Sequence, residues 1–291
     1  MKSKIINDKI IPYLLIAPVS IILILIMGVG IINCISQSLG FFPQIGLEQI
    51  TLSYYREIFR DSNFLESLIF SLKISLVSSI LAVIIGILLA YIMSQNRFSK
   101  VRYMILNIPL VVPHIIVVLL VFIIFSQTGI ISRVFYFFNI IKDSSEFIPM
   151  VSDKNGIGII LVYLWKGIPY ITLMVYNILK NINDNLQQVS INLGASKLQT
   201  FRYIVLPLAM PTIISSFIII FAFSFGSFEV PFLIGASTPK ALPVQAYLSY
   251  ASSDLMQRPI SMCINVLLSG ISFILLIIYD RFFNKISKYN V

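Results

Sequence analysis

Long apolar runs, separated by more polar segments, recur along the whole chain. Six of them meet or exceed the roughly 20 residues that a helix needs to cross the hydrocarbon core of a bilayer, and they cover residues 11–35, 64–93, 101–125, 157–179, 211–233 and 260–282. Strands of a membrane barrel would instead alternate in polarity over about 10 residues. Because lipid cannot hydrogen-bond the backbone, each span must satisfy its own backbone groups. The pattern predicts an all-α integral membrane protein with six transmembrane helices.

The composition agrees with this prediction and excludes other classes. Hydrophobic residues make up 58% of the chain and charged residues 11%, against about 45–50% and about 25% in soluble domains. Soluble enzymes, free nucleic-acid-binding proteins and disordered chains are thereby excluded. The two cysteines, Cys34 and Cys263, and the single histidine, His114, have no spacing that indicates a disulfide framework or a metal centre. We expect no cofactor and no metal, and we interpret His114, which follows Pro113, as a packed polar residue.

The distribution of basic residues among the loops explains the net charge of +9. With the N-terminus in the cytoplasm, the inner segments hold 12 basic and three acidic residues, and the outer segments hold seven basic and eight acidic residues. Cytoplasmic loops of membrane proteins carry the excess of lysine and arginine. We therefore predict that both termini are cytoplasmic, and the basic excess gives no support to a nucleic-acid partner.

The inner segment between the fourth and fifth runs, residues 183–207, has the most specific local pattern. Leu186, Val189 and Leu193 recur at helical spacing. Gly194 follows at the point where a residue in the left-handed conformation would cap that helix. The pattern predicts a short helix that ends in a tight glycine turn.

A second short helix is predicted directly after this turn. Ser196 and Gln199 form an S-x-x-Q capping box that would start it, and Pro207 is expected to stop it. Its apolar stripe is formed by Leu198, Phe201 and Val205. Two capped helices with an apolar face are more than a simple connection requires. They would dock against a cytoplasmic partner protein or lie on the lipid surface as interfacial helices.

This segment resembles the EAA loop of permease subunits of binding-protein-dependent ABC importers. That motif reads E-A-A, two residues, an acidic or apolar residue, G-A and, after a spacer, I-x-L-P. The glycine and the closing I-x-L-P, at residues 204–207, match, whereas the E-A-A triplet is replaced by Gln-Val-Ser. The resemblance assigns ATPase coupling to Gln188, Val189, Ser190, Leu193, Gly194, Ala195 and Ser196.

Further segments between residues 10 and 283 resemble the same family in order and spacing. They are the segment before the second helix, two prolines of the third, a W-x-x-x-P pattern in the fourth, the end of the fifth and an L-P-V before the last. In this chain they correspond to Thr51–Phe59, Pro109 and Pro113, Trp165 and Pro169, Phe225–Pro231 with Gly235, and Leu242–Val244.

The resemblance implies a type I ABC importer permease fold in a bacterial cell membrane. The implied partners are ATP-binding cassette ATPase subunits, a second permease subunit that is a different chain, and an extracytoplasmic solute-binding protein. The chain has no G-x-x-x-x-G-K-[ST] phosphate loop, so it is expected to have no ATPase site of its own. The expected division is an N-terminal part over residues 1–63, a core permease domain over 64–283 that contains the coupling loop, and a cytoplasmic tail over 284–291.

Ionisable and aromatic residues within the apolar runs are candidates for the pathway or its gate. These candidates are Lys166, Trp165, Glu229 and Phe228. Charged groups at membrane depth usually face a cavity or a partner. Lys166 would alternatively be snorkelling or held in a structural ion pair, for example with Glu229, and Glu229 would alternatively be a hydrated interfacial carboxylate. Trp165 would alternatively be an interface anchor.

The branch that the resemblance favours handles polyamines, aminophosphonates, thiamine and ferric iron. We therefore expect a small, charged solute, polyamine-like or aminophosphonate-like. The alternative function is an ion-coupled secondary transporter, which predicts internal repeats and matched intramembrane acids, and the sequence shows neither. A membrane enzyme is disfavoured because one histidine and no clustered acids leave no catalytic set.

Overall fold

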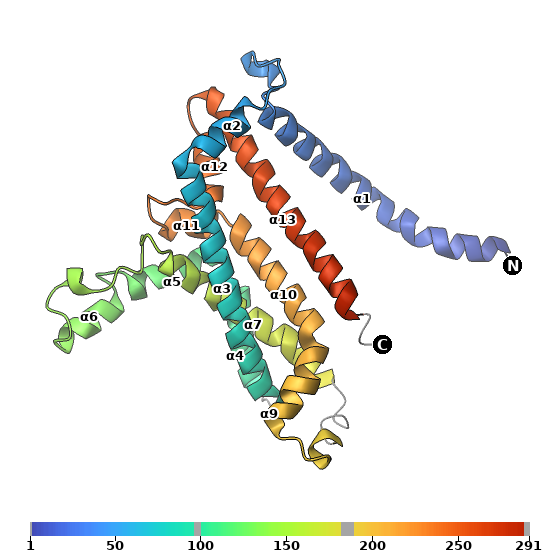
Figure 1. Cartoon of the computed structure of the whole chain (residues 1–291), viewed down its shortest axis with the longest axis vertical. Coiled ribbons are helices and arrows are strands. Elements are labelled where there is room, and N and C mark those ends of the chain that lie inside the picture. Colours follow the sequence, from blue (N-terminus) through green and yellow to red (C-terminus); the bar gives the residue numbers. More distant parts are fainter. Residues whose placement is uncertain (1, 96–99, 182–188, 288–291) are drawn as a thin grey trace. The chain divides into compact units, whose positions relative to one another are not determined.

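The computed structural model describes residues 2–95, 100–181 and 189–287, and every regular element within these ranges is a helix. Figure 1 shows the longer ones. The helices are α1 (Lys2–Ser38), α2 (Ser53–Arg60), α3 (Ser62–Gln95), α4 (Lys100–Val111), α5 (His114–Phe125), α6 (Ile130–Phe137), α7 (Ile157–Asn181), α9 (Lys197–Thr200), α10 (Leu206–Gly226), α11 (Glu229–Ile234), α12 (Leu242–Tyr250) and α13 (Arg258–Ser287). Short 3-10 turns, at Pro43–Ile45, Ser144–Glu146 and Leu255–Gln257, occur in three loops.

Six helical segments are long and apolar enough to cross a membrane, which confirms the predicted number within the described residues. They cover Ile11–Ser38, Ser62–Gln95, His114–Phe137, Ile157–Lys180, Lys197–Gly226 and Leu255–Ile278. The apolar side chains of the first segment are mostly exposed in the chain taken alone. This is the surface that lipid or a partner subunit would cover in the membrane.

The third apolar run is divided into two helices rather than forming the single helix expected over residues 101–125. Its first part, α4, ends at Val111, and α5 begins at His114. Pro113 stands between them with extended backbone angles, φ −57° and ψ 146°. Proline lacks the amide donor and disfavours helical angles at the residue before it, here Val112. By contrast, Pro109 lies within α4 and Pro169 within α7 without breaking either helix.

The fifth apolar run begins earlier than expected, and the prediction that Pro207 stops a helix is wrong. The helix is continuous from α9 through a π-helical turn, Phe201–Val205, into α10. In that turn the Leu206 amide donates to the Phe201 carbonyl, five residues back. The wider turn places Pro207 in the first turn of α10, where the missing amide donor is tolerated.

The same helix ends earlier than the expected residue 233. α10 stops at Gly226, Ser227 has extended angles, and α11 begins at Glu229. Pro231 provides the physical reason, because in an uninterrupted helix its ring would clash with the carbonyl four residues back, which is that of Ser227. The break presents Phe228 and Glu229 at the start of a new, short helix.

The chain divides into two compact units. The larger contains Ser62–Gln245 and Leu268–Val291, and within it α3, α7 and α10 pack against one another (Figure 1). Small side chains recur along the buried face of α3: Ser67, Ser71, Ser75, Ser78, Ala82, Gly86 and Ala90. Small residues let membrane helices approach closely. The close approach of α3 to α7 is seen at Gly86, where an added Cβ would lie only 2.8 Å from Cγ2 of Ile171.

The smaller unit contains residues 1–61 and 246–267. Within it the Tyr55 hydroxyl donates to Oγ of Ser38 at 2.9 Å, and the Cys263 thiol donates to the Ser38 carbonyl at 3.1 Å. Burial raises the pKa of the Tyr55 phenol. These bonds tie α2 and the start of α13 to the end of α1.

Candidate functional site

The predicted glycine turn is present and has the geometry of a Schellman cap. Residues 189–192 are helical, and Gly194 follows with φ +91°. The Gly194 amide donates to the Ile191 carbonyl at 2.9 Å, and the Ala195 amide donates to the Ser190 carbonyl at 3.0 Å. This pair of bonds satisfies the last carbonyls of a helix and requires a residue with positive φ, usually glycine. Gln188 lies outside the described residues.

The predicted capping box is also confirmed. The Ser196 amide donates to Oε1 of Gln199 at 2.7 Å, and the Gln199 amide donates to Oγ of Ser196 at 3.3 Å. Both bonds stabilise the start of α9. Residues 189–205, which contain the first helix, the turn, α9 and the π-helical turn, are called the two-helix loop below.

A hydroxyl contact that the sequence analysis did not predict joins the two helices of this loop. Oγ of Ser190 lies 2.8 Å from Oγ1 of Thr200, and both side chains are buried. The contact spans the glycine turn and joins the two helices to one another. No spacing rule distinguishes these two hydroxyl residues from their polar neighbours, so the sequence offered no signal for the pair.

The outer surface of the two-helix loop is apolar. Leu193 is 83% exposed and Leu198 is 71% exposed, and Val189 is exposed as well. A Cβ added to Gly194 would meet no atom within 4 Å, so the turn faces open space. A rigid loop that presents apolar side chains in this way is suited to contact another surface.

The two-helix loop is joined without interruption to a membrane helix. The ring of Phe201 lies 4.4 Å from that of Tyr91 in α3, between centroids, and Val205 is buried against the core shared by α3 and α7. The continuous helix then extends over Lys197–Gly226. An α-helix rises about 1.5 Å per residue, so this helix is long enough to carry a movement of the loop across most of a bilayer. The movement would reach the break before Phe228.

The second group of candidate residues meets around His114. Nζ of Lys166, in α7, lies 3.5 Å from Nδ1 of His114, at the start of α5. The His114 ring is stacked on Phe223 with centroids 5.1 Å apart. Within the part of the chain that is described, no ion pair joins Lys166 to Glu229. His114 is therefore in contact with Lys166, a pairing that the sequence context of His114 did not indicate.

A cavity of about 360 Å³ lies beside this contact. It is lined by Pro113, His114, Ile115, Phe228, Glu229, Phe232 and Leu233. Two of the predicted pathway residues, Phe228 and Glu229, thus share one cavity, and Lys166 adjoins it through His114. Trp165 is 45% exposed and does not line the cavity.

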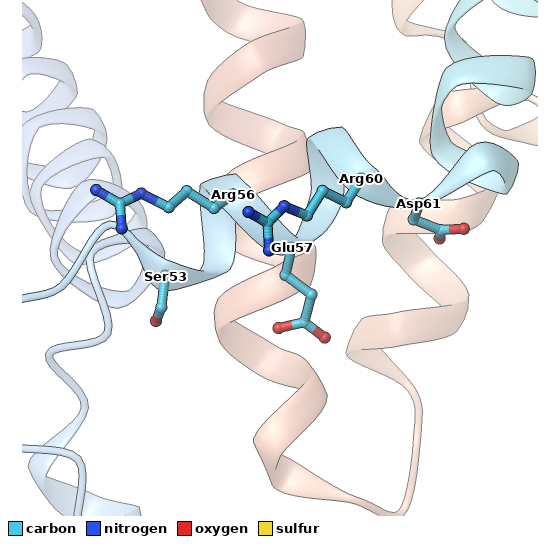
Figure 2. A pocket seen from close by; sticks show the side chains of 5 residues that line it. All are labelled: Ser53, Arg56, Glu57, Arg60 and Asp61. Carbon is cyan, nitrogen blue, oxygen red and sulfur yellow. The ribbon is translucent and has the colours of Figure 1, made fainter.

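The polar face of α2 is a third surface with concentrated charge. A pocket of about 490 Å³ is lined there by Ser53, Arg56, Glu57, Arg60 and Asp61. Figure 2 shows Arg56 and Arg60, one turn apart, extending the same way from the helix, while the Glu57 carboxylate extends below it. Ile58 is buried on the opposite face. This arrangement is typical of an amphipathic helix that lies at a membrane surface.

Comparison with known proteins identifies the family. Residues 82–288 match the model of the binding-protein-dependent transport system inner membrane component. The chain is 26% identical over 196 residues to the inner membrane ABC transporter permease protein YdcU of Escherichia coli, covering 64% of this chain and 62% of that protein. It is 32% identical over 225 residues to the molybdate/tungstate transport system permease protein WtpB of Methanocaldococcus jannaschii. This match covers 76% of this chain and 84% of that protein.

The fold agrees with that of solved transporters. A bacterial ABC transporter involved in the import of the acidic polysaccharide alginate superimposes with a TM-score of 0.78 at 17% identity, covering 98% of this chain and 99% of that one. The MetNI methionine ABC transporter superimposes with a TM-score of 0.59. The chain therefore belongs to the family of inner membrane components of binding-protein-dependent transport systems, and it is the permease subunit of an ABC importer rather than its ATPase.

Proposed function

We propose that the chain forms half of the translocation pathway of an ATP-driven importer and receives its driving force through the two-helix loop. The observation that carries this proposal is the loop itself: a Schellman cap at Gly194, a capping box at Ser196 and a buried hydroxyl contact support an exposed apolar surface. A surface held in place at three points can transmit a displacement that a flexible connection would absorb.

The direction of transmission follows from the helix that continues from the loop. An ATPase subunit bound to the apolar surface around Leu193 would move α9, and α9 is continuous with α10. The displacement would reach the break at Ser227 and move Phe228 and Glu229 beside the cavity. Interfaces that have two stable arrangements convert small shifts of this kind into opening and closing.

The partners follow from the same geometry and from the charge distribution. The excess of basic residues in the expected inner segments supports a cytoplasmic position for the two-helix loop, on the side where ATP is available. The polar face of α2 would then lie outside, where a solute-binding protein would dock. A second permease subunit, a different chain, would complete the pathway and cover apolar surface that this chain exposes.

The solute is proposed to be small and charged, polyamine-like or aminophosphonate-like. The relatives do not narrow this choice, because their names include molybdate/tungstate, galactooligosaccharide, sulfate, spermidine/putrescine and ferric transport systems. Support comes from the ionisable groups near the cavity: Lys166 lies within a membrane-length segment, where an unpaired charge is costly, and His114 and Glu229 line the cavity beside it.

Purification and reconstitution test the proposed function. The chain is expected to purify together with an ATPase subunit, and the complex in vesicles, with its binding protein outside, is expected to take up solute only when ATP is supplied to the ATPase. Uptake by the purified chain alone, driven by an ion gradient without ATP, would contradict the proposal and favour a secondary transporter.

A further inference from the structure

We propose that His114, Lys166 and Glu229 form a binding site for a small zwitterionic solute, with the anionic group of the solute on Lys166 and His114 and its ammonium group on Glu229. This inference rests on the proposed function, because it specifies the chemistry of the solute that crosses the pathway. It is derived from the contact between Lys166 and His114 and from the cavity that adjoins it.

The lysine and the histidine together form a donor pair for an anion. An ammonium group has three donors and no acceptor, so with Lys166 protonated, Nδ1 of His114 accepts from Nζ of Lys166 across the 3.5 Å contact. A neutral imidazole that accepts at Nδ1 carries its proton on Nε2. The stacking of the ring on Phe223 fixes its plane. The pair therefore keeps one positive charge. It offers the two remaining N–H donors of Lys166 and the Nε2–H of His114.

The carboxylate of Glu229 provides the opposite charge at the same cavity. Glu229 is exposed in the chain and lines the cavity together with His114. The neighbouring rings of Phe228 and Phe232 are stacked with centroids 4.9 Å apart. Ring faces next to a carboxylate favour an ammonium group, through cation–π attraction added to the charge.

The two charges are not neutralised by one another. In the described residues, Lys166 contacts His114, and no ion pair connects it to Glu229. Lys166 lies within a membrane-length segment, where a charge requires a partner, and a ligand with both charges would pair with Lys166 and Glu229 at once. A polyamine would pair with Glu229 and be repelled by Lys166, whereas an oxyanion would pair with Lys166 and be repelled by Glu229. A zwitterion is the class that satisfies both groups.

The size of the cavity limits the size of the ligand. A volume of about 360 Å³ lies at the lower end of the range of ligand pockets. It suits a solute with a few carbon atoms between its two charged groups. The apolar lining, formed largely by Phe228, Phe232 and Leu233, would contact that carbon segment.

Equilibrium binding of three short-chain probes to the purified permease–ATPase complex, without the binding protein, tests the inference. The probes are 2-aminoethylphosphonate, which is a zwitterion, ethylphosphonate, which is only anionic, and propylamine, which is only cationic. The wild-type complex is expected to bind the zwitterion at least about tenfold more tightly than either single-charge probe, because both charge pairs form only with it. Equal or tighter binding of a single-charge probe would overturn the inference.

Variants separate a binding role from a structural one by a change in preference. Lys166→Gln is expected to remove the advantage of the zwitterion over propylamine, and Glu229→Gln to remove its advantage over ethylphosphonate. Lys166→Arg keeps the charge and should keep the preference of the wild type. Lys73→Gln is the matched control, because Lys73 contacts Asn155 at 3.3 Å, which does not line the cavity, whereas Lys166 contacts His114, which does. Unchanged preferences in both glutamine variants would refute the site.

Failure of the proposed binding site can be told apart from failure of the proposed function. If the ATPase subunit co-purifies while the probes show no charge preference, the site inference fails and the proposed function stands. If no ATPase subunit attaches to the wild-type chain, the proposed function fails, and probe binding to the chain alone still decides whether the site exists.

Discussion

Gly194→Val should lower ATP-driven solute uptake at least about tenfold, which corresponds to about 1.4 kcal/mol or more of lost coupling, and should remove the ATPase subunit from the purified complex. Gly194 has φ +91°, and a residue with a Cβ pays roughly 1–2 kcal/mol for the left-handed conformation. The turn would therefore open, and the Schellman bonds of the Gly194 and Ala195 amides would be lost. The apolar surface around Leu193 would then no longer be held against its partner.

The loop between α1 and α2 contains a matched control for this variant. Gly46 has φ +81°, and a Cβ there also meets no atom within 4 Å. Gly46→Val imposes the same backbone strain at a turn outside the two-helix loop, so it should keep both the ATPase subunit and ATP-driven uptake. Co-purification and vesicle uptake, measured side by side for the two variants, give the comparison. Equal behaviour of the two would show that the turn at Gly194 has no special part in coupling.

Gly86→Leu should strongly reduce the stability of the membrane core. A Cβ on Gly86 would lie 2.8 Å from Cγ2 and 2.9 Å from Cβ of Ile171, so α3 and α7 would have to separate. Inserting side-chain atoms into a well-packed core typically costs about 1–3 kcal/mol. The melting temperature of the detergent-purified chain should fall, and the yield of monodisperse protein should fall with it.

Gly270→Leu, within α13, provides the comparison for Gly86. A Cβ on Gly270 meets nothing within 4 Å, and both positions lie inside helices, so leucine removes the same helix-destabilising glycine in each case. The melting temperature of Gly270→Leu should remain at or above that of the wild type. A Gly86→Leu variant as stable as Gly270→Leu would mean that α3 and α7 are not in close contact.

Local patterns along the chain predicted most of the fold because their physical causes are local. Length and hydropathy determine which segments span a membrane, and the number of predicted runs equals the number of membrane-length segments, although the third segment, His114–Phe137, begins and ends later than its run. The caps at Gly194 and Ser196 were predicted correctly because their bonds join residues only three to five positions apart. The effect of Pro207 was predicted wrongly because a π-helical turn, which has no simple sequence signal, absorbs it.

Contacts between distant segments were less accessible to prediction. His114 and Lys166 are 52 positions apart, and their contact depends on how α5 packs against α7, which the sequence of either helix does not specify. Lys166 was expected to have Glu229 as one possible ion-pair partner, whereas its described contact is with His114. The hydroxyl contact of Ser190 with Thr200 depends in the same way on the angle between two helices.

The most direct measurement of the central claim is photocrosslinking from position 193 in the assembled importer. Leu193 is replaced by p-benzoylphenylalanine, because its side chain is 83% exposed on the two-helix loop. As the control, Phe41 in the loop between α1 and α2 is replaced in the same way. We predict a crosslink between position 193 and the ATPase subunit, and none from position 41. Crosslinking of position 193 to lipid alone, with the ATPase subunit present in the complex, would show that the loop rests on the membrane surface and would contradict the account.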